Sequence, residues 1–147
     1  MIIPETPAAV LDTNVVLDWL VFRDARTAPL ADALLARRLR WLATGWMRDE
    51  LAHMLAHGSL ARWQANKEQA LTVFDNLVQL LPPAPRCRLH CTDADDQVFI
   101  DLAVAQSAQW LLTHDRALLK LARRARLHGV QVATPAVWST APTTVGP

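Results

Sequence analysis

AAVLDTNVVLDWL, residues 8–20, begins as an apolar run and turns polar at Asp12. Residues 8–12 are typical of a short buried strand, because the apolar run 8–11 before Asp12 fits a strand covered on both faces. The residues that follow are too densely apolar for the alternation of a half-exposed strand, and they favour a helix over 14–22. The stretch therefore predicts a strand that leads directly into a helix, which is the repeating unit of an α/β fold.

The rest of the chain repeats this alternation of short apolar runs and helical patterns. Three further strands are expected at 41–44, 110–113 and 130–134. Helices are expected at 28–40, 46–58, 66–81, 97–108 and within 114–129, with a short one starting at Pro135. Because strands alternate with helices throughout, the sequence predicts an α/β domain with a mostly parallel sheet.

The length and composition of the chain are those of one globular domain, with 147 residues of which 52% are apolar. No repeat or linker divides the sequence, so we expect a single domain over 1–138 and a disordered tail over 139–147. No apolar run approaches the roughly 18 residues of a membrane span. The opening MIIPETP lacks the basic start of a signal peptide, so a cytoplasmic protein with no membrane partner is expected. The net charge of +1 neither requires nor excludes a nucleic-acid partner.

Acidic residues follow the predicted strands or begin the helices after them: Asp12, Glu50, Asp93, Asp95, Asp96 and Asp115. Ligands of parallel α/β sheets bind beyond the carboxyl ends of the strands, so these acids are expected along one edge. Carboxylates packed together raise one another's pKa, and a divalent cation removes that conflict. Their hard oxygen atoms suit Mg²⁺ or Mn²⁺. Taken singly, each acid is also explained as a helix cap or a solvated side chain.

Four motifs, read in order, carry a resemblance to a known family: VLDTNVVLDWL, TGWMRDEL, TDADDQVFIDLAVAQSAQWLLTHDRALL and VATPAVW. Together they resemble the PIN domain (PilT N-terminal) family, which includes the VapC-like toxins of bacterial type II toxin–antitoxin pairs. The resemblance extends over residues 9–138. It implies a three-layer α/β/α sandwich with a mostly parallel, PIN-like (Rossmann-like) sheet, and an activity that cleaves RNA with the help of a metal ion.

The acidic positions of that family fall, motif by motif, on Asp12, Glu50, Asp96 and Asp115. The resemblance implies that Asp12, Asp96 and Asp115 hold Mg²⁺ or Mn²⁺. Glu50 would complete the site or orient a water molecule. The implied function is that of an endoribonuclease that hydrolyses phosphodiester bonds, with RNA as substrate and a small antitoxin protein and a homodimer as candidate partners.

Polar positions that support the metal site in relatives fall on Asn14 and Thr113. Thr13 has no such counterpart and is interpreted as a local hydrogen-bonding or capping residue. The sequence also departs from the common pattern, because His114 stands where many relatives have glycine and Ala117 where they have a second aspartate. These departures leave open whether one or two metal ions are bound.

The positive charge of the chain is mostly arginine, which can bind phosphate bidentately. Arg116, Lys120 and Arg123 or Arg124 fall along one face of the helix expected within 114–129. This basic stripe beside the acids is a candidate RNA contact. A solvated helix face explains the same stripe.

Three other interpretations remain open. His53 and His57 are spaced like the ligands of a zinc-hydrolase helix, but Met54 stands where its glutamate would follow the first histidine. A phosphatase of the haloacid dehalogenase type would need an acid where the chain has Asn14. A PIN-like module that binds RNA or protein without catalysis is kept open by Ala117.

Two cysteines, Cys87 and Cys91, flank His90 in the segment RCRLHC, which is expected to be extended. They could form half of a metal site, although zinc sites usually have four ligands. Two cysteines do not indicate a disulfide framework in a chain of this kind. Reduced thiols without a chemical role are the favoured interpretation.

Overall fold

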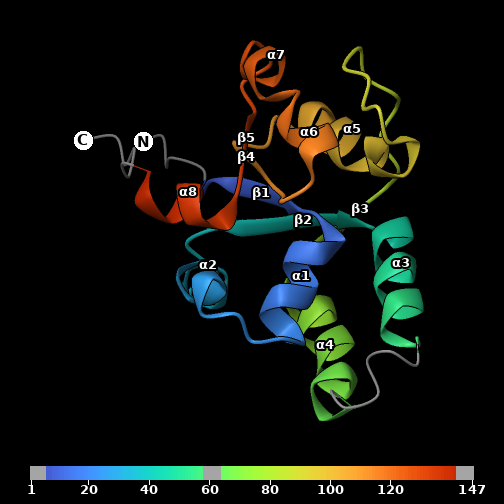
Figure 1. Cartoon of the computed structure of the whole chain (residues 1–147), viewed down its shortest axis with the longest axis vertical. Helices are drawn as coiled ribbons and strands as arrows, with labels where there is room; N and C mark the ends of the chain where they lie inside the picture. The colour runs from blue at the N-terminus through green and yellow to red at the C-terminus, as the bar shows by residue number, and fades with distance from the viewer. Residues whose placement is uncertain (1–5, 58–63, 142–147) are drawn as a thin grey trace, which may run out of the picture.

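Five parallel strands form one sheet in the computed structural model, which describes residues 6–57 and 64–141 apart from the side chains of 64 and 65. The strands are β1 Ala8–Leu11, β2 Arg40–Thr44, β3 Val78–Leu81, β4 Trp110–Leu112 and β5 Gln131–Ala133. Their order across the sheet is β3-β2-β1-β4-β5, and every neighbouring pair is parallel. Helices cover both faces (Figure 1), so the predicted three-layer sandwich is confirmed.

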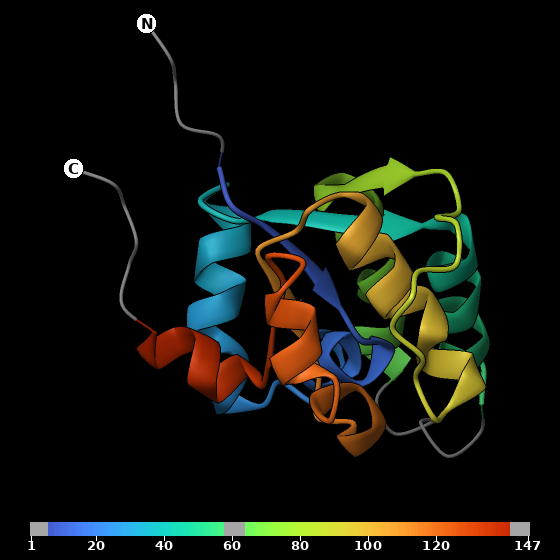
Figure 2. The ribbon, with the colours of Figure 1, turned by 90° about the horizontal axis from the view of Figure 1, so that it is seen from above.

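The helices divide into two layers that Figures 1 and 2 show on opposite faces of the sheet. One layer consists of α1 Thr13–Leu20, α2 Ala28–Leu35, α3 Gly45–Leu55 and α4 Gln64–Leu77. The other consists of α5 Gln97–Ala105, α6 Arg116–Leu119 and α7 Ala122–Arg126. The last helix, α8 Pro135–Thr140, packs against α2 and the 3₁₀ turn η1 Ala25–Thr27, while a second turn, η3 Ala94–Asp96, precedes α5.

The strand order reverses between β1 and β4, which are neighbours at the centre of the sheet. From β1 the chain builds outward through β2 to β3, and then returns to place β4 and β5 on the other side. The register pairs Leu11 with Leu112, so the two strands end level with each other. The backbone N–H of Asp12 still donates to the Leu112 carbonyl at 3.0 Å. The crevice at such a reversal is where parallel α/β sheets bind ligands.

The core explains why β1 is apolar throughout. All four of its residues are at most 3% exposed, because helices lie above and below the central strand. On the face that carries α1 and α4, the Trp41 ring of β2 packs against Trp19 at 5.5 Å and against Phe74 at 5.1 Å between ring centroids. These buried aromatic contacts tie both helices to the sheet.

One strand was not expected. The helix predicted over 66–81 ends at Leu77, and Val78–Leu81 instead forms β3, which pairs with β2. The apolar residues at the end of this stretch fit either structure over so short a length. Pairing with β2 decides between them, because it satisfies the backbone groups of both segments. The resulting edge strand leaves the Leu80 side chain 61% exposed.

The helix predicted within 114–129 is also wrong in one respect, because it is broken into α6 and α7. At the break the Leu121 N–H donates to the Leu118 carbonyl at 2.9 Å, a bond that closes the tighter turn of a 3₁₀ helix. The change of direction leaves both Leu118 and Leu121 buried. The chain thus gains apolar burial at the cost of a continuous helix.

The domain boundary predicted after residue 138 falls inside α8, which continues through Thr140. The rest of the predicted tail, 142–147, lies outside the described residues, as does Gly58, where the third predicted helix was expected to end. Within the described ranges, no helix has both the length and the apolar character needed to cross a membrane.

Candidate acidic metal site

Asp12 is held at the junction of β1 and α1, where it is only 3% exposed. One carboxylate oxygen, Oδ1, accepts the backbone N–H of Asn14 at 3.2 Å and so caps α1. The other, Oδ2, accepts the Thr113 hydroxyl at 2.7 Å. Burial raises the pKa of Asp12, and the hydrogen bond from Thr113 opposes that shift. The acid is therefore anchored rather than free to move.

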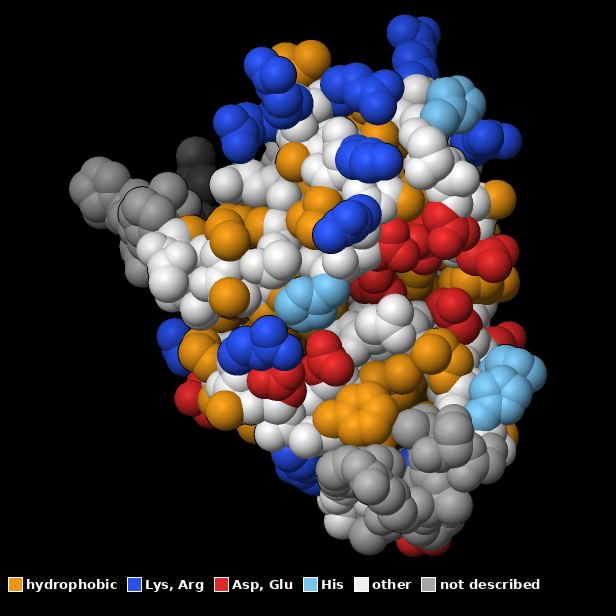
Figure 3. Space-filling view, in the orientation of Figure 1, with side chains coloured by type: hydrophobic (Ala, Val, Ile, Leu, Met, Phe, Trp, Pro, Cys, Tyr) orange, Lys and Arg blue, Asp and Glu red, His pale blue; other side chains and the backbone are white. Residues whose placement is uncertain are grey.

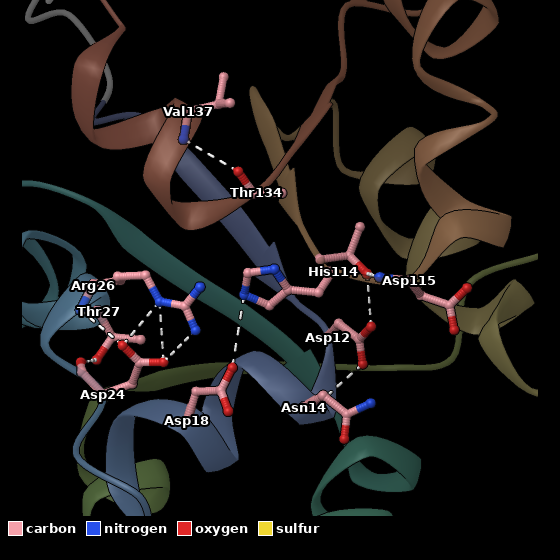
Figure 4. A network of polar contacts seen from close by, with 11 residues as sticks. Asp12, Asn14, Asp18, Asp24, Arg26, Thr27, His114, Asp115, Thr134 and Val137 are labelled. Atoms are coloured by element: carbon pink, nitrogen blue, oxygen red, sulfur yellow. Dashed lines mark hydrogen bonds and ion pairs between the residues drawn. The ribbon is translucent and has the colours of Figure 1, made fainter.

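Thr113 links the two strands that meet at the reversal point. Its hydroxyl donates to Asp12 and accepts the backbone N–H of Asp115 at 2.9 Å, while the side chain is fully buried. Asp115 in turn caps α6, because its Oδ1 accepts the N–H of Ala117 at 2.7 Å. A single threonine thus links the acids that follow β1 and β4, Asp12 and Asp115, which Figure 4 shows near each other.

Glu50 approaches this group from α3 through a contact that the sequence did not reveal. Its Oε2 accepts the hydroxyl of Thr13 at 2.7 Å, although the two residues are 37 positions apart. Thr13, interpreted from the sequence as a local residue, is 5% exposed. Its hydrogen bond to Glu50 positions a side chain of another helix. Burial raises the pKa of Glu50, and the charges of Asp12 and Asp95 add to the shift.

Asp96 has the most perturbed carboxyl of the group. Desolvation by burial, a hydrogen-bonding contact with Asp115 and repulsion from the charges of Asp12, Asp115 and Asp93 together raise its pKa to about 8. Its Oδ2 is buried and has no hydrogen-bond partner within the described part of the chain. A buried carboxylate oxygen without a partner is available to bind a cation.

Asp93, Asp96 and Asp115 each contribute one carboxylate oxygen to a group whose atoms all lie within 4.8 Å of one another. Asp93 was interpreted as a cap or a solvated residue, and it does accept the N–H of Asp95 at 3.0 Å. Its carboxylate nevertheless joins the group. Asp12 lies beside this trio rather than within it. The donor set consists of hard oxygen atoms, so these residues fit Mg²⁺ or Mn²⁺.

Asn14 takes part through its backbone N–H, which Asp12 accepts, and its side chain is exposed. His114, the residue that departs from the family pattern, points away from the acids toward α1, with its Nε2 3.7 Å from Asp18 Oδ2 (Figure 4). Nearby, Asp24 accepts three hydrogen bonds from the side chain of Arg26. That contact lowers the pKa of Asp24 to about 2.

The segment that leads into the acidic group is fastened to α5 by buried polar contacts. The Gln97 side chain accepts the N–H of Cys91 at 2.7 Å, donates to the Leu89 carbonyl at 2.7 Å and donates to Asp101 at 2.8 Å. Asp101 also accepts the N–H of Cys87 at 2.9 Å. Because Asp93 and Asp96 follow directly, these bonds position the acids.

Exposed cations lie next to the acids. Five exposed side chains of α6, α7 and the turn between them form what we call the basic ridge: Arg116, Lys120, Arg123, Arg124 and Arg126. Figure 3 shows the positive side chains over the end of the molecule where α6 and α7 lie, with the acidic patch immediately below them. A positively charged patch and a negatively charged patch thus adjoin on one surface of the protein.

The alternative metal sites find no support in the described residues. The rings of His53 and His57 contact each other edge to face, with centroids 4.7 Å apart, and both are exposed. Cys87 and Cys91 are free thiols, and burial raises the pKa of each. A raised pKa disfavours the thiolate, the form that binds metals or attacks substrates.

The fold and the site together define the class: a Rossmann-like α/β domain with an acidic site at the reversal point of its parallel sheet. A family model described as PIN domain matches residues 8–117, well over half of the chain. The chain therefore belongs to the PIN domain family, as the motifs indicated. A search of curated proteins finds no match.

Solved structures similar to this chain include that of VapBC2 from Rickettsia felis bound to a DNA fragment from their promoter. The TM-score is 0.59 at 15% sequence identity, and the alignment covers 85% of this chain and 96% of the other. At 15% identity the comparison shows a shared fold and does not by itself show a shared function.

The sequence identified most of the acids that meet here but not all of their supporting residues. Asp12, Glu50, Asp96 and Asp115 come from four segments and interact electrostatically at one edge of the sheet. Thr13 was missed, because it also has an ordinary local explanation. Asp93 was expected along this edge with the other acids of TDADD, but it was not assigned to the metal site.

Proposed function

We propose that this PIN domain is a metal-dependent endoribonuclease. The observation that carries the proposal is Asp96, whose buried Oδ2 has no hydrogen-bond partner in the described chain and whose carboxyl lies against that of Asp115. Three carboxylates at such spacing repel one another unless a cation neutralises them. A cation in this position would also neutralise the negative charge of a phosphodiester and so support nuclease chemistry.

Each acid has a distinct role in the proposal. Asp96 and Asp115 hold Mg²⁺ or Mn²⁺ together with Asp12, and Asp93 adds a further oxygen at the exposed side. The bound ion would lower the pKa of a coordinated water and neutralise the phosphate. Glu50, held in place by Thr13, orients the attacking water. Hydrolysis then needs no covalent intermediate on the protein.

RNA is the proposed substrate, and Arg116 and Lys120 are its proposed contacts nearest the acids. Both side chains are exposed, and α6 begins directly after Asp115. Cations here would bind the phosphates that flank the scissile bond. The rest of the basic ridge would extend that contact along α7.

The proposal includes a role as the toxin of a toxin–antitoxin pair, with a small antitoxin and a second copy of the chain as partners. The support for the toxin role and the antitoxin is the fold shared with a chain of the VapBC2 structure. A toxin that cleaves RNA must be restrained in the cell that makes it, so a protein that covers the acidic site is a natural partner.

The enzymatic prediction concerns Asp12→Asn and Asp96→Asn. Each should fold normally yet cleave a fluorescent RNA with Mn²⁺ at least about 100-fold more slowly, because loss of a metal ligand forfeits several kcal/mol of transition-state stabilisation. EDTA should abolish cleavage by the unmodified protein.

Asp32→Asn, an exposed acid on α2, is the matched control and should keep full activity. Undiminished cleavage by both site variants would rule out the acidic site. Binding of RNA without any metal-dependent cleavage would instead favour a non-catalytic PIN module.

The cellular prediction is that induced expression of the unmodified chain arrests bacterial growth and that Asp12→Asn does not. The physical reason is that growth arrest requires cleavage of RNA, and the Asp12 variant lacks a metal ligand. Growth curves after induction measure it, with equal protein levels checked by immunoblot. Equal growth of the two strains would contradict the toxin role while leaving the nuclease chemistry to the assay above.

A further inference from the structure

Trp46 is a large aromatic side chain at the rim of the acidic site. It lies in the first turn of α3 and is 42% exposed, whereas Trp19 and Trp41 are buried. Positions four apart on a helix are neighbours on its surface, so Trp46 stands one turn before Glu50 on the same face. An indole is therefore available beside a group of carboxylates.

The ring is supported from the other helix of the site. The centroid of Trp46 lies 6.3 Å from that of Phe99, and the two ring planes meet at 76°. Phe99 is 1% exposed and follows Asp96 by one turn of α5. The edge contact with a buried ring holds the indole in place while leaving much of its surface exposed. Trp46 thus links α3, which carries Glu50, to α5, which begins directly after Asp96.

Two charged features, the acidic site and the basic ridge, indicate what an exposed ring here could bind. The acids are suited to a phosphodiester, and the basic ridge lies beside them on the side of α6 and α7. Trp46 comes from α3, in the opposite helix layer. A strand whose phosphates run from the ridge to the acids would bring a neighbouring nucleobase toward α3. An unpaired base presents a flat π-face that can stack on an indole, whereas the bases of a duplex are already stacked and paired.

We infer that Trp46 is a stacking platform for a nucleobase next to the scissile phosphate, and that it makes the site selective for single-stranded over double-stranded RNA. The inference rests on the proposed function, because it takes RNA as the molecule at the acidic site. It adds a specificity residue that the acids alone do not imply. In this inference the acids carry out the hydrolysis, and the indole favours binding of single-stranded RNA.

The test measures binding in EDTA, where no cleavage occurs. The full chain is titrated into a fluorescein-labelled unstructured 12-nucleotide RNA, and separately into the same strand annealed to its complement, with anisotropy as the readout. Trp46→Leu should weaken binding of the single strand roughly 5- to 150-fold, the range expected for loss of one base stack. Binding of the duplex should stay within about twofold, since phosphate contacts dominate it.

Trp46→Phe keeps a smaller ring and should retain most of the single-strand affinity. Leu35→Ala, an exposed apolar residue at the end of α2, is the matched control and should change neither affinity. A 2-aminopurine base placed in the RNA should lose emission on binding the unmodified protein and Trp46→Phe but not Trp46→Leu. Circular dichroism melts confirm that each variant is folded.

Unchanged single-strand affinity in Trp46→Leu would overturn the inference, and would leave contact with a protein partner as the explanation of the exposed ring. An equal loss for single strand and duplex would also overturn it. Cleavage of RNA by the unmodified protein with Mn²⁺ is scored separately. The stacking role can therefore fail while the nuclease stands, or stand on binding while the nuclease fails.

Discussion

The raised pKa of Asp96 reflects its burial and the repulsion among the carboxylates of the site. In the folded metal-free chain its pKa is raised to about 8, against an ordinary value of 3.8. Between these values the folded chain retains a proton that the unfolded chain has lost. The stability of the metal-free protein must therefore fall as pH rises through this window and level off above it. A bound divalent cation would reverse the penalty by favouring the ionised carboxylate.

The residue-scale prediction is that Asp96→Asn stabilises the metal-free protein, and does so more at pH 8 than at pH 5. Asparagine cannot ionise, so it avoids the penalty that wild type incurs above about pH 4. Because the side chain keeps some contact with solvent, we expect only about 1–2 kcal/mol, which is roughly 2–8 °C in Tm. Thermal melts in EDTA at both pH values measure the difference.

Asp32→Asn on the exposed surface of α2 provides the reference for a mere change of charge. If the Tm difference between Asp96→Asn and wild type is the same at pH 5 and pH 8, the pKa of Asp96 is not raised in the folded protein.

At the scale of elements, the segment 86–91 depends on α5 for its position. Gln97 satisfies the Cys91 N–H and the Leu89 carbonyl, which are backbone groups that the segment cannot pair by itself. These bonds fix a short irregular segment against α5, so the acids that follow it start from a defined point. Asp101 reinforces the arrangement from the next turn of the helix.

Gln97→Leu should destabilise the protein by about 2–4 kcal/mol, because it leaves two buried backbone groups unpaired at about 1–3 kcal/mol each. Urea unfolding measures the loss, and hydrogen exchange at the Cys91 amide should become faster than in wild type. Gln106→Leu, an exposed glutamine just after α5, is the matched control with little expected change. A Gln97→Leu variant as stable as this control would contradict the bridging role.

At the scale of the whole molecule, charge distribution matters more than net charge. A net charge of +1 creates no general attraction for nucleic acid. The basic ridge and the acids instead lie side by side. Under the proposed function, the ridge would attract an RNA strand and the acids would cleave it. Such an arrangement would hold RNA by local phosphate contacts, and salt weakens those.

The double variant Arg116→Ala/Lys120→Ala should bind single-stranded RNA more weakly and with a smaller salt dependence. Loss of two phosphate contacts should reduce the slope of log K against log salt by about 1.4, since each contact contributes about 0.7 for a single strand. Anisotropy titrations at several salt concentrations give the slope. Arg38→Ala, an exposed arginine just before β2 at the amino edge of the sheet, should leave the slope unchanged. Equal slopes for the double variant and wild type would remove the ridge from the RNA path.

The sequence by itself determined the features that local pattern encodes. The apolar run before Asp12 predicted a covered central strand, and helical spacing of apolar residues located most of the helices, because burial on one or both faces leaves a period in the sequence. The alternation of these units determined the α/β class. Acids placed after strands predicted the edge at which Asp12, Glu50, Asp96 and Asp115 meet.

Only the tertiary structure decided what depends on partners far along the chain. Val78–Leu81 is a strand because β2 lies beside it, and the turn between α6 and α7 forms because two leucines gain burial there. Thr13 takes part in the site because its hydroxyl donates to Glu50, and Asp93 because its carboxylate lies beside those of Asp96 and Asp115. The Trp46 ring is held by its contact with Phe99. None of these pairings leaves a periodic trace, since the free energy that selects them comes from contacts formed only when the chain is folded.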